Sequence, residues 1–318
     1  MTQEASGVRK VDLSKLLDDF ILDCKDRNLA DSTIVGYRHT VKDFLEFLSG
    51  RGQHPFDADR FVFKEYLHYR RGLGLDPQTL DHNFSALSGF YGFLSFEGYV
   101  AGNPVLAVRK RFLREYKEDD RGDPPRKLIS LEEMSMLVNS IINPRDRAIA
   151  VLLAKTGLRR NELVSLNVSD IDWAELSITL QRKKFKKRSG RVVFFDDECS
   201  RVLRRWLLIR ETLHPTTDAL FIGDQGGRLM RSGVYNIIVK YATRVGLNDS
   251  NSKSIEDHFS THNLRHFFTT YLRRAGMPRE FIQVLRGDRR REAIDIYDHV
   301  DRDELRKSYL ACVPKLGI

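Results

Sequence analysis

Two residues able to bind a phosphate lie three positions apart near the end of the 318-residue sequence. His262 and Arg265 share one face of a predicted helix, while Leu264 and Phe268 anchor that helix to a core. Tyr297 follows among charged residues. A guanidinium can bond two oxygens of a phosphate and a phenol can act as a nucleophile, so this stretch indicates phosphate chemistry.

The elements that must position this stretch form a predicted mixed domain over residues 128–318. Ser130 and Glu133 can form a capping box at the start of its first helix. Asn143–Pro144 can begin a second helix, which Gly157 would end. Further helices are predicted by apolar periodicity around residues 202–207, 234–241, 262–272, 281–285 and 302–310.

Strands are predicted where the period of the apolar residues changes to two. Residues 176–180 and 192–195 are expected to pair as a β-hairpin, with the strongly basic run 181–191 at its tip. Residues 220–222 predict another short strand. The fold class is therefore mainly α, with a small antiparallel β-sheet in an α+β domain.

The first hundred residues predict helices only. Apolar residues recur at helical spacing in four segments, and Asp31 or Ser32 is expected to cap the second. Pro77 opens the fourth helix, which we expect to end at Asn103–Pro104. The predicted organisation is a tail (1–10), an all-helical domain (11–108), a charged linker (109–127) and the mixed domain (128–318). A solvated basic loop is the alternative for the linker.

The composition favours a polyanionic partner. Lysine and arginine number 53 against 44 aspartates and glutamates, a net charge of +9, which favours nucleic acid over a membrane surface. The three cysteines show no metal-ligand spacing and are expected to be reduced thiols. No signal peptide and no apolar run of the ~18 residues that a membrane helix needs is found, so we expect a cytoplasmic protein.

The motifs in their order resemble the tyrosine recombinases, the integrase family that includes phage integrases and Xer-type recombinases. The matching residues are Thr156-Gly157-Leu158-Arg159-x-x-Glu162-Leu163, the basic hairpin, His262-x-x-Arg265 and Tyr297. The resemblance covers nearly the whole chain and includes a helical core-binding domain at the N-terminus. It implies site-specific recombination of double-stranded DNA through a 3′-phosphotyrosyl intermediate, without a cofactor, by a homo-tetramer assembled on DNA.

The resemblance also assigns roles to residues. Arg159 and Arg265 would bind the non-bridging phosphate oxygens, and Tyr297 would be the nucleophile. Two other tyrosines are weaker candidates. Tyr271 falls on the apolar face of the predicted helix and is expected to pack in the core, and Tyr309 lies at the wrong distance for the family.

Lys183 on the hairpin matches the general acid for the leaving 5′-oxygen, with Lys186 as the alternative. The whole basic run could instead be a phosphate-contacting patch. His262 would assist proton transfer or bond the phosphate. The DNA-contacting residues expected in the hairpin are Lys184, Lys186, Lys187 and Arg188.

Asp288 is the departure from the family pattern, which usually has histidine or tryptophan nine residues before the tyrosine. An ionised aspartate cannot donate a hydrogen bond to phosphate. It could orient Arg159 or Arg265, help to deprotonate Tyr297, or lie outside the site; we expect it to support an arginine. Glu162 would support the site, with helix solvation as the alternative. The Arg-Gly-Asp variant resembles integrases of archaea and their mobile elements.

Three predictions remain open from the sequence. Arg38 and Lys42 are candidate DNA contacts on the second helix, although any exposed helical face would look the same. The last helix, 302–310, could exchange between protomers or pack on its own domain. The alternative functions are a type IB-like topoisomerase and a DNA-binding regulator that kept the fold. The sequence shows no carboxylate cluster with the spacing of metal ligands, so it does not favour a metal-dependent nuclease.

Overall fold

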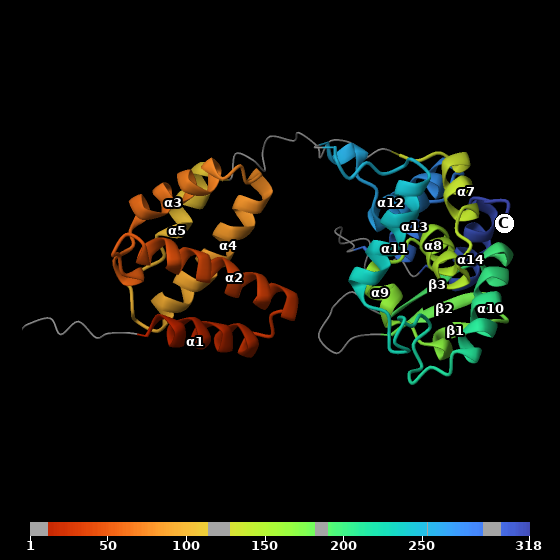
Figure 1. Cartoon of the computed structure of the whole chain (residues 1–318), viewed down its shortest axis with the longest axis horizontal. Helices are drawn as coiled ribbons and strands as arrows, with labels where there is room; N and C mark the ends of the chain where they lie inside the picture. Colours follow the sequence, from red (N-terminus) through yellow and green to blue (C-terminus); the bar gives the residue numbers. More distant parts are fainter. Residues whose placement is uncertain (1–11, 114–127, 182–189, 253, 289–299) are drawn as a thin grey trace, which may run out of the picture. The chain divides into compact units, whose positions relative to one another are not determined.

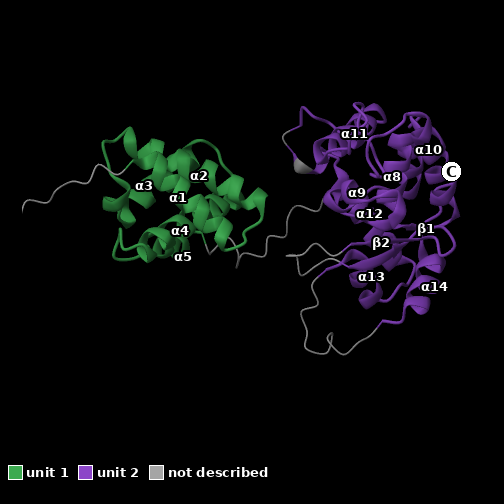
Figure 2. Cartoon of the chain, turned by 90° about the horizontal axis from the view of Figure 1, so that it is seen from below, with its two compact units in different colours: residues 1–121 green, residues 122–318 purple. Residues whose placement is uncertain are grey.

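The computed structural model describes residues 12–113, 128–181, 190–252, 254–288 and 300–318 (Figure 1). The chain forms two compact units, residues 1–121 and 122–318, coloured green and purple in Figure 2. The prediction of a mainly helical chain with a small antiparallel sheet is confirmed.

Unit 1 is all-helical in its described part. Asp59 and Asp76 cap α3 and α4 through their side chains, as short acidic residues do at helix starts. Aromatic rings fill the core; Phe44 stacks on Phe63 at 4.9 Å between ring centroids. The elements are α1 (Leu13–Asp26), α2 (Asp31–Ser49), η1 (Pro55–Asp57), α3 (Arg60–Gly72), α4 (Pro77–Phe96) and α5 (Val105–Phe112).

Two predicted boundaries in this unit are wrong. The cap of α2 is Ala30, not Asp31 or Ser32, and no side chain bonds the helix start. Asp31 is instead the first helical residue, where a negative charge is favourable at the positive end of the helix dipole. Helix α4 ends at Phe96, not at Asn103–Pro104, because the chain turns at Gly98, which has a φ of 76°.

Asn103 instead lies just before α5, whose first helical residue is Val105. Its side-chain oxygen accepts a hydrogen bond from the main-chain nitrogen of Val105 at 3.1 Å. Helix α5 runs past the boundary expected at residue 108, and Leu113 after it is 3% exposed. Phe112 and Leu113, which lie in the expected linker, therefore pack with the helices of unit 1.

Unit 2 is built around α8, whose residues from Ala148 to Thr156 are all buried. Helices α7, α10, α11 and α12 pack against α8. The expected capping box at Ser130, the cap at Asn143 and the end of α8 at Gly157 are confirmed. The helices are α7 (Leu131–Asn139), α8 (Pro144–Thr156), α9 (Arg160–Ser165), η2 (Val168–Asp170), α10 (Asp197–Thr212), α11 (Arg231–Arg244), η3 (Ile255–Asp257), α12 (Thr261–Arg274), α13 (Arg279–Arg286) and α14 (Arg302–Cys312).

In the described part of unit 2, the sheet has three antiparallel strands in the order β1-β2-β3, with β1 at Ile171–Asp172, β2 at Ser177–Leu180 and β3 at Arg191–Phe194. Ile178 lies opposite Val193, so the predicted hairpin is confirmed. Its basic tip, residues 182–189, lies outside the described residues. The predicted strand at 220–222 is wrong: only single bridges form there, between Asn167 and Ala219 and between Ile222 and Arg228.

The segment after α14 closes onto the centre of unit 2. Lys155 is fully buried, and its ammonium group pairs with Asp196 and Glu198 and donates to the main-chain oxygen of Pro314. Glu198 in turn accepts from the main-chain nitrogen of Leu316 at 2.9 Å. We call Lys155, Asp196 and Glu198 the buried ion cluster. Within the single chain, α14 packs on its own unit, through residues such as Leu305 and Tyr309.

Candidate functional site

Arg159 is placed by the end of α8. Gly157 has a φ of 61°, a conformation that favours glycine, and a Cβ there would collide with the ring of Phe268. The chain turns at this point and starts α9, with the main-chain nitrogen of Arg159 donating to Glu162 at 2.8 Å. The Arg159 side chain therefore begins at a sharp, well-anchored turn and remains 34% exposed.

Arg265 is placed by α12. Ser260 caps this helix, and Leu264 and Phe268 on its apolar face are fully buried, as predicted. The Arg265 side chain is only 9% exposed. Its guanidinium donates from Nη1 to the main-chain oxygen of Gly157 and from Nη2 to that of Arg286, the latter at 2.8 Å.

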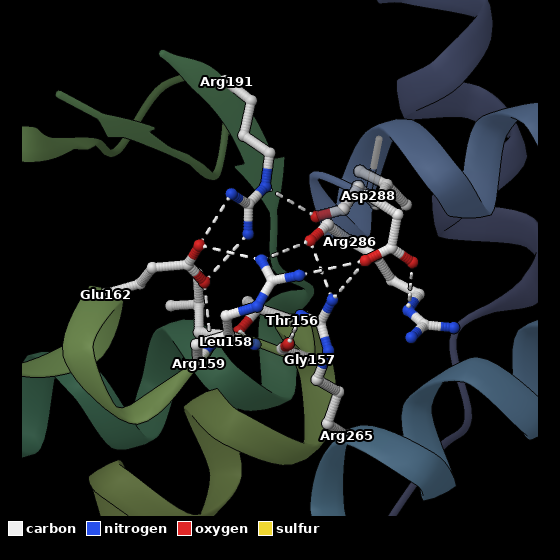
Figure 3. A network of polar contacts seen from close by, with 10 residues as sticks. Thr156, Gly157, Leu158, Arg159, Glu162, Arg191, Arg265, Arg286 and Asp288 are labelled. Carbon is white, nitrogen blue, oxygen red and sulfur yellow. Dashed lines mark hydrogen bonds and ion pairs between the residues drawn. The ribbon is translucent and has the colours of Figure 1, made fainter. Parts of the chain in front are cut away.

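The main-chain oxygen of Arg286 also accepts from Arg159 Nη1, at 3.0 Å. This oxygen belongs to the last residue of α13, where helix carbonyls lack partners within the helix and the dipole is negative. The end of α13 thus holds both guanidinium groups side by side (Figure 3).

Asp288 contacts both arginines as well. Gly287 ends α13 with a φ of 60° and turns the chain so that Asp288 faces the pair. One carboxylate oxygen accepts from Arg159 Nη2 at 3.0 Å and from Arg265 Nη2 at 3.1 Å. The other oxygen pairs with Arg286 Nε at 3.0 Å (Figure 3). Asp288 therefore lies in the site, beside the arginines it was expected to support; its role remains a prediction.

Arg191 belongs to this network and was missed from the sequence. It begins β3, is 9% exposed, and donates two hydrogen bonds to Glu162, at 2.9 and 3.0 Å. Its Nε donates to the main-chain oxygen of Leu285 in α13. Arg191 therefore ties the sheet to α9 and α13. Within the basic run 181–191, nothing local in the sequence distinguishes Arg191 from its neighbours.

The charges of the network perturb the ionisation of two members. Burial lowers the pKa of Arg265, and the nearby charges of Arg159 and Arg286 lower it further, to about 10; Asp288 and Glu162 act in the opposite direction. Burial alone would raise the pKa of Glu162, but hydrogen bonds from Arg191 and Arg159 outweigh it and hold the pKa below the ordinary value. Both groups are therefore charged at neutral pH.

A surface pocket of about 170 Å³ opens beside the arginines. Arg159, Arg160, Arg231, His262 and Arg265 are among the residues that line it. His262 is exposed and shares this pocket with Arg265, as their spacing predicted. Among the described residues that line the pocket, none is acidic, so it is suited to an anion.

Other predicted site residues are placed elsewhere or are not described. Tyr297, Lys183, Lys184, Lys186, Lys187 and Arg188 lie outside the described residues. Tyr309 is fully buried and its hydroxyl donates to the main-chain oxygen of Lys155, while burial raises its pKa well above the ordinary value. Tyr271 packs against Phe267 at 4.4 Å between ring centroids.

The two candidate DNA contacts of unit 1 lie on α2 and are exposed. Arg38 pairs with Asp18 at 2.8 Å, and Lys42 lies 3.8 Å from Glu46. Over the described residues, no group of histidine, cysteine and acidic side chains could hold a metal ion. No described helix is long and apolar enough to cross a membrane.

Comparisons with known proteins identify the class. Residues 128–304 match the model of the phage integrase family, and residues 16–94 match that of the SAM-like N-terminal domain of phage integrases. The chain belongs to the phage integrase family. It is a tyrosine-type site-specific recombinase, an enzyme that cuts and rejoins DNA strands.

The curated relatives match over nearly their whole length. The chain is 28% identical to the tyrosine recombinase XerC of Pelotomaculum thermopropionicum over 315 residues, which covers 94% of this chain and 98% of the relative. It is 27% identical to the tyrosine recombinase XerD of Staphylococcus epidermidis, covering 91% of this chain and 95% of that one.

Solved structures share the fold. The recombinase XerH, in a post-cleavage complex with its difH substrate, matches with a TM-score of 0.67 at 22% identity, covering 92% of this chain and 83% of that one. The integrase of the transposon Tn1549, bound to transposon end DNA, matches with a TM-score of 0.65 at 19% identity, covering 92% and 97%.

Proposed function

We propose that unit 2 cleaves a DNA phosphodiester at the pocket beside Arg159 and Arg265. The observation that carries this proposal is the meeting of the two guanidinium groups, which come from the start of α9 and from α12 and lie within bonding distance of one carboxylate oxygen. Two adjacent guanidiniums that already bind an oxygen anion are suited to a phosphate and, more strongly, to the pentavalent transition state.

In the proposed reaction the hydroxyl oxygen of Tyr297 attacks phosphorus and the bond from phosphorus to the 5′-oxygen breaks. The phenol loses its proton, and the leaving oxygen gains one from Lys183, with Lys186 as the alternative donor. His262 lies at the pocket and would bond the phosphate or assist proton transfer. Attack by a 5′-hydroxyl on the phosphotyrosine reverses the step, so no external energy source is needed.

The proposed partner is double-stranded DNA, with four copies of the chain assembled on two sites. The net charge of +9 and the basic run 181–191 support binding to a polyanion. The XerH and Tn1549 proteins were solved with DNA, which agrees with this partner. The tetramer, the DNA contacts of the hairpin and of α2, and a cytoplasmic location are parts of the same proposal.

A nicked duplex that carries the target site, taken from DNA flanking the gene, tests the proposal. The nick lets the 5′ fragment leave, so a covalent adduct accumulates and resists boiling in detergent. Wild type should form the adduct, Tyr297→Phe should not, and the matched control Tyr309→Phe should retain it, because the Tyr309 hydroxyl is bonded inside the core. DNA binding without any adduct would favour the regulator; an adduct with Tyr297→Phe would mean that the nucleophile is wrongly assigned.

A further inference from the structure

We propose that Asp288 is a built-in competitor of the phosphate: its carboxylate occupies the donors of Arg159 and Arg265 in the free protein and must leave them when a phosphate binds. This inference rests on the proposed function of the two arginines. It differs from the expectation that Asp288 holds an arginine in position.

The hydrogen bonds of the arginines show why the two anions compete. Both protons on Arg265 Nη2 are engaged, one by the main-chain oxygen of Arg286 and one by Asp288. On Arg159, Nη1 donates to Glu162 and to Arg286, and Nη2 donates to Asp288. A phosphate that uses the paired Nη groups of both arginines must therefore displace an acceptor.

Only one of the shared acceptors can leave easily. The Arg286 oxygen is part of the main chain at the end of α13, which Arg191 holds through its bond to the neighbouring oxygen of Leu285. Asp288 is attached through two rotatable side-chain bonds and is 29% exposed. Its second oxygen already pairs with Arg286 Nε, so the carboxylate keeps a cationic partner after it releases the other two arginines.

The arginines do not depend on Asp288 for their orientation. Arg265 is held by the main-chain oxygens of Gly157 and Arg286. Arg159 is held by the same Arg286 oxygen and by the Glu162 carboxylate. Losing the carboxylate would leave the guanidiniums in place but without this anion. The effect of Asp288 is therefore to weaken phosphate binding and to neutralise the arginine cluster while no substrate is present.

The experiment measures orthophosphate binding to the full chain at constant ionic strength. Both tryptophans, Trp173 and Trp206, lie in unit 2, so the thermal midpoint of their fluorescence reports on that unit alone. A ligand that binds the folded state raises this midpoint according to its dissociation constant. The Arg159→Ala variant serves as the baseline: the shift of its thermal midpoint with phosphate measures the stabilisation that does not come from binding at the site.

Asp288→Asn should bind phosphate about tenfold more tightly than wild type, because a neutral acceptor bonds a guanidinium about half as strongly as a carboxylate. Asp288→Ala should show a similar gain, which excludes a new bond from the asparagine amide. The matched control is Glu280→Gln, which removes one exposed negative charge from α13. It should bind phosphate like wild type.

Each other outcome overturns the inference. Weaker binding by both Asp288 variants would make Asp288 a support for the arginines, and equal binding would place it outside phosphate recognition. A gain for asparagine alone would indicate an added donor, not a removed competitor. If wild type and all variants respond to phosphate like Arg159→Ala, the phosphate site itself is refuted, and the inference with it. On the nicked duplex, both variants should also reach half-maximal adduct formation at lower DNA concentration than wild type.

Discussion

Replacing Lys155 by methionine tests the role of the buried ion cluster in holding unit 2 together. The Lys155 side chain has no exposed surface, and the side chains of Asp196 and Glu198 are 2% and 11% exposed. Methionine keeps the approximate volume of the lysine but removes the positive charge. Asp196 and Glu198 would then remain buried next to each other without the buried cation between them; Asp196 would keep only the largely exposed Lys315, whose ammonium lies 3.3 Å away.

The expected loss of stability is about 4 kcal/mol, the typical cost of leaving a buried charge without its partner. For a unit of about 200 residues, each kcal/mol lowers the unfolding midpoint by about 2–4 °C, so the predicted decrease is about 12 °C. This loss is a large fraction of the roughly 5–15 kcal/mol that stabilises a typical domain.

Tryptophan fluorescence is the suitable assay, because it follows unit 2 in the intact chain. Lys307→Met is the matched control: Lys307 is an exposed lysine on α14, and its loss should shift the midpoint by less than about 2 °C. Hydrogen exchange at the main-chain nitrogens of Leu316 and Gly317, which bond to Glu198, should become faster in the Lys155 variant. A midpoint equal to or above that of wild type would refute the reasoning.

Two further predictions concern pH and the turn before Asp288. Burial would raise the pKa of Glu198, but bonds from main-chain nitrogens and from Lys155 outweigh it and hold the pKa at about 2, against an ordinary value of 4.5. The ionised Glu198 therefore contributes about 2 kcal/mol to the stability of unit 2, allowing for screening; this contribution is present above pH 4.5 and is lost as the pH falls towards 2. Unfolding of Glu198→Gln, followed by tryptophan fluorescence, should lack this part of the pH dependence. An acid profile like that of wild type would contradict the assignment. Gly287→Ala should destabilise unit 2 by about 1–2 kcal/mol and reduce adduct formation. The reason is that a φ of 60° disfavours alanine and that the new Cβ would collide with the Arg191 guanidinium. A variant with the stability and cleavage of wild type would contradict this prediction.

Features that depend on neighbours in the sequence could be predicted. The capping box at Ser130, the cap at Asn143 and the glycine end of α8 each involve a few adjacent residues, so the sequence contains all the relevant information. The failure at Asp31 is also local, because a suitable capping residue became the first helical residue. The failure at residues 220–222 is not local: a strand needs a partner, and in the described part of unit 2 this apolar run forms only isolated bridges.

The candidate site was only partly predictable for a different reason. Residue type and spacing selected His262 and Arg265, and the resemblance to the tyrosine recombinases added Arg159. The contacts of Asp288 with Arg159 span 129 positions and those of Arg191 with Leu285 span 94, and no local pattern specifies such pairs. The burial of Lys155 was equally hidden, since a lysine near the end of a helix is ordinarily solvated.

The main-chain oxygens that hold the arginines have an evolutionary consequence. A point mutation replaces a side chain, but the carbonyl groups of residues 157 and 286 persist whatever amino acid the gene encodes there. The orientation of Arg265 is thus largely protected from mutation, provided that the backbone keeps its turn at Gly157. Asp288, by contrast, acts through its side chain, so a substitution at position 288 would change the charge beside the two guanidiniums and leave these main-chain acceptors in place.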